Sequence, residues 1–204
     1  MMSGDREEIL KRVGEALAPL PERSPYPHYD TDLTVTFKDG SVDPWVRFKS
    51  MFAAVNGRVF ESVSELGHWL LESGHTHGCC DPDLVDRLRT AFPEGLAMET
   101  GFDRARIDDY AFGITRARGA IAESGTLVLD DRTTWQRLAA LAPWVHVAVL
   151  SRSDLWRDIP TAVDNLDDDP NVIWVTGPSK TADVEGILIE GVHGPGEQVC
   201  LLID

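Results

Sequence analysis

Two spacings of apolar residues divide this chain into helical and extended stretches. Residues 5–17 repeat apolar side chains at helical spacing, which predicts an amphipathic helix. The apolar face of that helix consists of Ile9, Leu10, Val13 and Leu17. Unbroken apolar runs such as 144–150 (WVHVAVL) are typical of strands that are buried on both faces. The chain therefore combines both kinds of element.

From residue 42 onward, the same patterns place helices and strands in alternation. Helices are expected at 42–55, 64–72, 81–92, 135–141 and 155–166. Strands are expected at 58–62, 95–99, 119–122, 126–129, 144–150, 171–176, 187–190 and 198–203. Alternating β and α units predict an α/β fold, a three-layer domain with a mixed, largely parallel sheet.

Prolines separate the first predicted helix from the rest of the chain. Residues 19–40 contain Pro19, Pro21, Pro25 and Pro27, so they are expected to form an extended arm or a surface loop. We predict an N-terminal helix and Pro-rich arm over residues 1–40 and a single α/β domain over residues 41–204. A chain of 204 residues has the length usual for one domain.

Acidic residues outnumber Lys and Arg by 34 to 19, which gives a formal net charge of -15. Nucleic-acid backbones and anionic lipid surfaces are bound through Lys and Arg, so this excess argues against both as partners. No apolar run approaches the roughly 20 residues that cross a bilayer. Binding of a small anionic ligand remains possible, because a local Lys or Arg can outweigh the negative field of the rest of the surface.

Cysteine usage indicates a reducing compartment. The chain has three cysteines, Cys79, Cys80 and Cys200, two of them adjacent, which is not a disulfide framework. The first residues carry acids where a secretion signal has a basic segment, so a cytoplasmic location is expected. An iron–sulfur cluster takes four cysteines and the chain has no dinucleotide-binding fingerprint, so we expect no cofactor.

A turn of small and polar residues, Gly177-Pro178-Ser179-Lys180-Thr181, follows the strand expected at 171–176. A phosphate-binding P-loop has glycine directly before its lysine, and Ser179 stands there instead. Two interpretations remain. Either Lys180 and nearby backbone N–H groups hold a carboxylate or phosphate, or the segment is an ordinary turn that ends the strand.

Two acids, Asp183 and Glu185, follow two positions apart. In an extended segment they share a face with Thr181 and can act as acid and base or hold a divalent metal. Alternatively, one caps a short helix and the other is solvated. His193 stands between turn-forming residues and is expected at the same rim, as a hydrogen-bond donor or as an ordinary structural histidine.

Glu123 and Ser124 lie in a short link, Ala122-Glu123-Ser124-Gly125-Thr126, between two expected strands. A nucleophile elbow has glycine at the position of Ala122, so this link is not one. The link is either a tight turn in which Gly125 takes an unusual backbone conformation, or a binding loop to which Glu123 contributes.

Histidines and cysteines cluster in His75-Thr76-His77-Gly78-Cys79-Cys80-Asp81. His and Cys at this spacing can reach a zinc or copper ion. A structural zinc site usually has a second pair of ligands, and neither CxxC nor HxxxH occurs in the chain. We expect a polar loop with no metal, with a metal-binding module as the alternative.

Three segments of the chain resemble one known family. GAIAESGTLVL (residues 119–129), HVAVL (146–150) and TGPSKTADVEGILIEGVHGPGE (176–197) are together similar to the LUD domain family, and within it to the lactate utilization protein C branch. One departure is Ser124, where the family more often has threonine. The resemblance implies a fold similar to the sugar-phosphate isomerase and CoA-transferase class.

The resemblance also implies a role in the oxidation of L-lactate to pyruvate, beside partners that carry iron–sulfur motifs. This chain then corresponds to a non-redox accessory component of a lactate utilization system. The alternative is a stand-alone small-molecule enzyme or binding protein that holds a carboxylate or phosphate at the strand-end rim. Whether the chain is an enzyme stays open. For both functions, the candidate ligand-binding residues are Glu123, Ser124, Lys180, Thr181, Asp183, Glu185 and His193.

Overall fold

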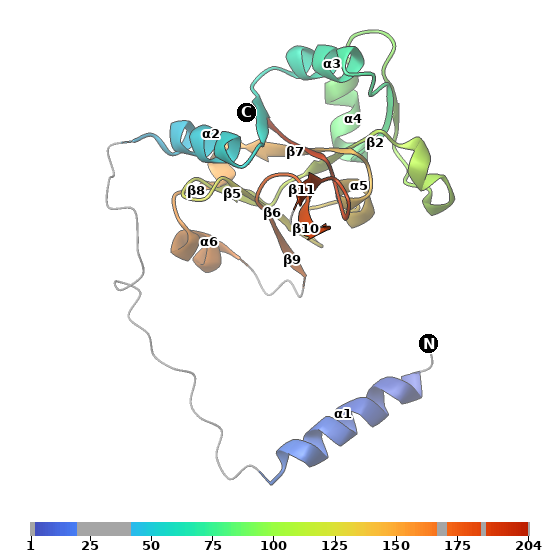
Figure 1. Cartoon of the computed structure of the whole chain (residues 1–204), viewed down its shortest axis with the longest axis vertical. Coiled ribbons are helices and arrows are strands. Elements are labelled where there is room, and N and C mark those ends of the chain that lie inside the picture. The colour runs from blue at the N-terminus through green and yellow to red at the C-terminus, as the bar shows by residue number, and fades with distance from the viewer. Residues whose placement is uncertain (1–2, 20–41, 167–170, 185–186, 204) are drawn as a thin grey trace. The chain divides into compact units, whose positions relative to one another are not determined.

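A computed structural model of the chain describes residues 3–19, 42–166, 171–184 and 187–203 (Figure 1). The chain divides into two units, residues 1–35 and residues 36–204. The first unit contains helix α1 (Ser3–Leu17), so the helix expected at the N-terminus is present. Its apolar side chains Ile9, Leu10, Val13 and Leu17 are all exposed.

Within the described residues, the second unit is built on a six-stranded sheet in which all neighbouring strands are parallel. In spatial order the strands are β1 (Arg58–Phe60), β12 (Glu197–Ile203), β7 (Val145–Ser151), β4 (Phe112–Arg116), β2 (His77–Cys80) and β3 (Ala97–Glu99). The strands β12, β7 and β4 are buried along most of their length. The predicted α/β class with a largely parallel sheet is confirmed.

Helices α3 (Val63–Glu72) and α4 (Pro82–Arg89) cover one face of this sheet. The hydroxyl of Ser62 caps α3 by accepting from the N–H of Glu65 (3.3 Å). The carboxylate of Asp81 caps α4 by accepting from the N–H of Asp83 (3.0 Å). The apolar faces of both helices pack on alternate strand residues in a cluster that includes Leu66, Leu70, Leu84, Leu88, Ile114, Val147 and Leu201.

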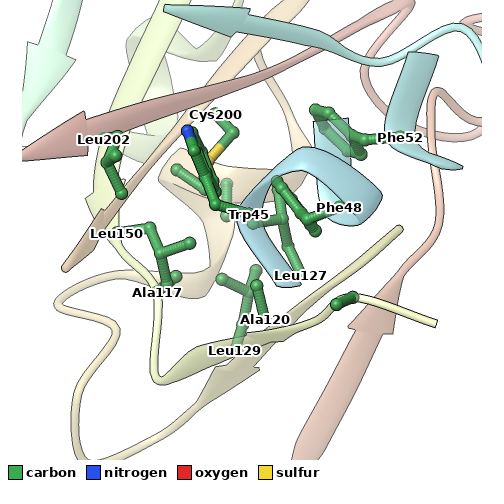
Figure 2. Packing of buried hydrophobic residues seen from close by; sticks show 13 residues of the cluster. Trp45, Phe48, Phe52, Ala117, Ala120, Leu127, Leu129, Leu150, Cys200 and Leu202 are labelled. Carbon is green, nitrogen blue, oxygen red and sulfur yellow. The ribbon is translucent and has the colours of Figure 1, made fainter. Parts of the chain in front are cut away.

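The opposite face of the sheet packs against helix α2 (Pro44–Ala54) and a second sheet. The second sheet has the order β8 (Leu155–Trp156), β5 (Gly119–Ile121), β6 (Thr126–Asp130) and β9 (Val172–Val175). Figure 2 shows Trp45, Phe48 and Phe52 of α2 among aliphatic side chains from both sheets. The ring centroids are 5.3 Å apart for Trp45 and Phe48 and 5.2 Å apart for Phe48 and Phe52, so the rings stack in a row.

Shorter elements complete the second unit. Helix α5 (Arg137–Leu141) packs on β4 and β7, and helix α6 (Ile159–Asn165) packs on β5 and β8. The strands β10 (Lys180–Val184) and β11 (Ile187–Glu190) form an antiparallel hairpin. Short 3-10 segments are η2 (Arg104–Asp109), which is kinked at Arg106, and η3 (Arg152–Asp154). In the part of the chain that the structure describes, no helix is long and apolar enough to cross a membrane.

Two expectations about local structure are wrong. The segment 155–166 is not one helix, because strand β8 takes its first residues and α6 begins at Ile159, where Pro160 fits the first turn. The segment 75–81, expected as a polar loop, contains strand β2. Gly78 lets β2 approach β4 closely, since a Cβ there would lie 2.3 Å from the carbonyl oxygen of Phe112. Antiparallel pairing occurs in the second sheet and the hairpin, not in the main sheet.

The first testable prediction concerns the contact between the link 122–125 and α2. Gly125 has a φ of +64°, and a Cβ there would lie 2.4 Å from the backbone nitrogen of Phe52. Gly125→Ala is expected to lower the free energy of unfolding by about 2–5 kcal/mol, because left-handed strain adds to a steric clash. Urea unfolding measures the loss.

The control is Gly74→Ala. Gly74 has a φ of +79°, but a Cβ there would meet nothing within 4 Å. This variant carries the strain without the clash, and we expect a loss of only about 1–2 kcal/mol. Equal losses in the two variants would mean that the link does not depend on its contact with α2.

Candidate functional site

Two turns singled out by the sequence meet at one place in the structure. One spans residues 177–179 after β9, and the other spans residues 193–195 before β12. The N–H of Ser179 donates to the carbonyl oxygen of Pro195 (2.9 Å), and the N–H of Gly191 donates to the carbonyl oxygen of Ser179 (2.9 Å). The two motifs are therefore joined through their backbones.

A cavity of about 430 Å³ lies beside these turns, and we call it the turn cavity. Its lining comes from α5, β9, the two turns and the start of β12. Most lining residues are apolar, and the polar ones are Thr176, Ser179, His193 and Gln198. Among the described residues that line it, none is Asp, Glu, Lys or Arg. A mostly apolar cavity with a few converging polar groups is typical of a small-molecule site.

A chain of hydroxyl groups reaches the turn cavity from the second sheet. Ser124 Oγ lies 2.7 Å from Thr126 Oγ1, which lies 2.8 Å from Thr176 Oγ1. Thr126 is buried, and Thr176 lines the cavity. Ser124, a candidate from the sequence, is thus connected to the cavity through two hydrogen bonds and does not itself line it.

A second polar chain reaches the cavity from the main sheet. The side-chain amide of Gln198 on β12 contacts Nδ1 of His146 on β7, with Gln198 Nε2 at 2.8 Å and Gln198 Oε1 at 3.1 Å. The other ring nitrogen, His146 Nε2, lies 2.9 Å from Oγ1 of Thr115 on β4. All three side chains have an exposed fraction of 1% or less. We call Thr115, His146 and Gln198 the buried triad.

Burial keeps the histidine of the triad neutral. It lowers the pKa of His146 to about 4, because the imidazolium would lose its hydration, and the hydrogen bond with Gln198 only partly offsets this.

One member of the triad is visible in the sequence, because His146 interrupts the apolar run WVHVAVL. Its partners lie 31 positions before it and 52 positions after it, so they depend on the order of the strands.

Two other candidates, Lys180 and Thr181, lie on the hairpin strand β10. Lys180 Nζ is 3.3 Å from Oε1 of Glu190, its partner in the strand register, and Asn56 Nδ2 donates to the same oxygen at 2.7 Å. The hydrogen bonds from Asn56 and Lys180 lower the pKa of the Glu190 carboxyl. Lys180 already has an anionic partner, and its role as the contact for a ligand anion stays a prediction.

The remaining candidates are spread over three places. His193 lines the turn cavity, and its side chain is exposed. Asp183 belongs to β10, but its side chain and the whole of Glu185 lie outside the described residues. Glu123 binds the start of α6, where its Oε2 accepts from the N–H of Ile159 (3.1 Å).

Comparison with known proteins identifies the family. The pattern of the LUD domain matches residues 84–203, which contain both turns, every residue lining the turn cavity and the buried triad. The chain belongs to the LUD domain family. The resemblance predicted from segments 119–129, 146–150 and 176–197 is confirmed.

Relatives of this LUD protein include proteins named for lactate use. A Lactate utilization protein C from Deinococcus radiodurans is 25% identical over 187 residues, which cover 89% of this chain and 83% of that protein. A Lactate utilization protein C from Bacillus subtilis is 33% identical over 99 residues, which cover 45% of this chain and 41% of that protein. An uncharacterized protein from Neisseria meningitidis is 35% identical over 118 residues, which cover 54% of this chain and 51% of that protein.

The chain thus spans about half the length of the Neisseria relative.

A solved structure supports the family fold. The crystal structure of a DUF162 family protein from Deinococcus radiodurans matches with a TM-score of 0.58 at 18% sequence identity. The match covers 79% of this chain and 96% of that chain. At this level of identity it shows a shared fold.

The histidines and cysteines of segment 75–80 of the LUD protein are dispersed. His75 Nε2 lies 3.8 Å from Oε1 of Glu197, and His77 has separate partners. Cys79 and Cys80 are consecutive in β2, so they point to opposite faces of the sheet, and burial raises the pKa of both thiols to about 12. Within the described ranges, no group of three or more His, Cys, Asp or Glu side chains is placed to hold a metal ion.

His77 belongs to a charged cluster on the outer strands of the main sheet. Its Nδ1 lies 2.8 Å from the carbonyl oxygen of Asp109, and its Nε2 lies 2.9 Å from Oε1 of Glu99. Arg106 donates to both carboxylate oxygens of Glu99, at 3.0 and 3.2 Å. The pKa of His77 is raised, first by the Asp109 carbonyl and then by Glu99, because both ring nitrogens face acceptors.

The buried triad predicts the effect of removing one hydroxyl. Thr115→Val keeps the side-chain shape and leaves a ring nitrogen of His146 without its partner, so we expect the free energy of unfolding to fall by about 1–3 kcal/mol. Thr115→Ser keeps the hydroxyl and loses one buried methyl group, which costs about 1 kcal/mol. Urea unfolding compares the two, and a valine variant as stable as the wild type would contradict the triad.

His146 and His77 are expected to affect stability in opposite directions as pH changes. The folded pKa of His146, about 4, is below its unfolded value of 6.5, so its contribution is present above pH 6.5 and is lost towards pH 4, by roughly 3 kcal/mol. The raised pKa of His77 gives a contribution that is present below pH 6.5 and is lost as pH rises through the folded pKa. NMR titration of the two rings tests this, and a shared midpoint near 6.5 would contradict both shifts.

Proposed function

We propose that this LUD protein is a non-redox accessory component of an L-lactate utilization system, acting beside iron–sulfur proteins that oxidise lactate to pyruvate. The observation that carries the proposal is the relative named Lactate utilization protein C that aligns with 89% of this chain. The turn cavity supports it further, because its whole lining lies inside the LUD match.

The cysteines support the non-redox part of the proposal. Cys79, Cys80 and Cys200 are buried, and burial raises the pKa of each thiol, so the thiolate form is disfavoured. The thiolate is the form that binds metals, and an iron–sulfur cluster takes four such ligands. We therefore assign electron transfer to the partners.

Charge supports an interaction with other proteins. The net charge of -15 gives this protein a long-range field that steers an oppositely charged partner, and salt screens that field. If charge steers complex formation with the iron–sulfur proteins, its rate is expected to fall as the salt concentration rises.

The turn cavity also favours a second candidate function, a stand-alone enzyme or binding protein for a small carboxylate or phosphate. Thr176, Ser179, His193 and Gln198 converge in an otherwise apolar lining, as in small-molecule sites. In this case the isolated protein binds its ligand without partners and is stabilised by it.

Reconstitution tests the accessory function. The rate to measure is lactate-dependent reduction of an artificial electron acceptor by the iron–sulfur proteins, with and without this chain. We expect the rate to fall strongly when this chain is omitted and to return when the full chain is added back. A rate that is unchanged on omission would remove the chain from the oxidation step and leave the stand-alone function.

Paired histidine variants locate the site within the reconstituted system. His193→Ala changes an exposed histidine of the turn cavity and is expected to lower the rate. His68→Ala changes a similarly exposed histidine on α3, which is not among the residues that line the cavity, and is expected to leave the rate unchanged. Equal rates in the two variants would place the contribution of this chain outside the cavity.

A further inference from the structure

A second cavity, of about 610 Å³, is lined by η2, by the segment 131–136 and by α5, and we call it the arginine cavity. Its described lining shares only Leu141 with that of the turn cavity. The volume lies within the range that is usual for small-molecule sites. The lining has an apolar part, formed by Ile107, Trp135, Leu138 and Leu141, and a charged part, formed by Arg104, Asp131 and Arg137.

The charged part gives the arginine cavity a sign opposite to that of the whole protein. Two guanidinium groups and one carboxylate leave the described lining with one net positive charge, whereas the chain carries -15. Asp131 already has two partners, since its Oδ1 lies 2.9 Å from Nε of Arg137 and its Oδ2 accepts from Nδ2 of Asn171 at 2.7 Å. It neutralises one guanidinium at most, and it holds Arg137 in place.

Arg104 supplies the charge that this pair leaves over. Within the residues that the structure describes, its side chain forms no hydrogen bond and no ion pair. Acids close to it in sequence are engaged elsewhere: Asp103 Oδ1 accepts from the N–H of Ala105 (2.9 Å), and Asp109 Oδ2 accepts from Nε of Arg106 (3.0 Å). A guanidinium group binds a carboxylate through two parallel hydrogen bonds, so Arg104 is available as an anion contact.

The backbone on both sides of the arginine cavity is held in place. On one side, the hydroxyl of Thr134 donates to the carbonyl oxygen of Arg116 (3.1 Å) and accepts from the N–H of Asp130 (3.3 Å). On the other side, Arg106 of η2 donates to both carboxylate oxygens of Glu99 on β3. Walls that are already ordered lower the entropic cost of binding a ligand.

We propose that the arginine cavity is a second ligand site, which binds an organic monoanion with an apolar body, such as an aromatic carboxylate. Arg104 and Arg137 hold the anionic group, and the apolar part of the lining around Trp135 contacts the body. The single net positive charge of the lining matches one negative charge on the ligand. The proposal is independent of the proposed function, because it concerns another cavity.

The first test uses two probes that differ in charge. Naphthoate and naphthamide have the same aromatic body, but only naphthoate is an anion. In NMR titrations of the full chain, we expect naphthoate to bind about tenfold more tightly, the effect of a charge-assisted hydrogen bond. The shifts should affect the Trp135 indole and α5, not Thr176 and Ser179 of the turn cavity. Equal binding of the two probes, no binding of naphthoate, or shifts confined to the turn cavity would overturn the proposal.

The second test removes the unpaired guanidinium. Arg104→Gln is expected to weaken naphthoate binding about tenfold and to leave naphthamide binding unchanged. Arg104→Lys keeps the charge without the planar fork, so we expect an intermediate affinity. The matched control is Arg152→Gln, which removes the same charge from an exposed arginine of η3 outside the described lining and is expected to leave both affinities unchanged.

Two results would overturn the role of Arg104. One is an unchanged affinity for naphthoate in Arg104→Gln, and the other is an equal loss in Arg104→Gln and Arg152→Gln, which would assign the effect to overall charge. Urea unfolding verifies that the variants are folded, and Arg104→Lys carries the test if Arg104→Gln is not. Reconstitution reports separately, since a rate that depends on this chain supports the accessory function even if naphthoate does not bind.

Discussion

A strand that is covered on both faces has to satisfy each of its polar side chains from inside the protein. This constraint governs β4, β7 and β12, the central strands of the LUD protein. Towards α3 and α4 their buried side chains are all apolar. Towards the second sheet they carry Thr115, His146 and Gln198, and each of these three bonds to another member of the set. The register that pairs His146 with Gln198 therefore also builds one wall of the turn cavity.

The second sheet contributes to the cavity through its own register. Leu127 pairs with Val175, which brings Thr126 opposite Thr176 and aligns the hydroxyl chain. Each sheet thus delivers one polar side chain to the cavity, Gln198 from β12 and Thr176 from the end of β9. The stacked rings of α2 pack against both sheets in a single core that also contains Ala140, Ile173 and Val175 of the cavity lining, so this packing holds the two walls of the cavity together.

The sequence predicts those elements whose burial produces a run of apolar residues along the chain. The runs at 144–150 and 198–203 are apolar because β7 and β12 are buried on both faces, and both strands were predicted. The strands β2 and β4 are not predicted by the sequence, because Gly78 and Gly113 are residues typical of turns. Here glycine permits close packing instead: a Cβ at Gly113 would lie 1.8 Å from the carbonyl oxygen of Ala139. The meeting of the two turns agrees with the shared rim expected for His193, whereas the buried triad needs three strands whose order the sequence does not reveal.

The described lining of the turn cavity combines apolar side chains with four polar ones, Thr176, Ser179, His193 and Gln198. Moving a proton on or off a bound ligand needs a group that titrates near working pH. His146 does not serve, because its pKa is lowered to about 4 and both of its ring nitrogens are engaged. Gln198, Ser179 and Thr176 carry amide or hydroxyl groups, which do not titrate in that range. These side chains can orient a bound ligand through hydrogen bonds, which agrees with the accessory role proposed above.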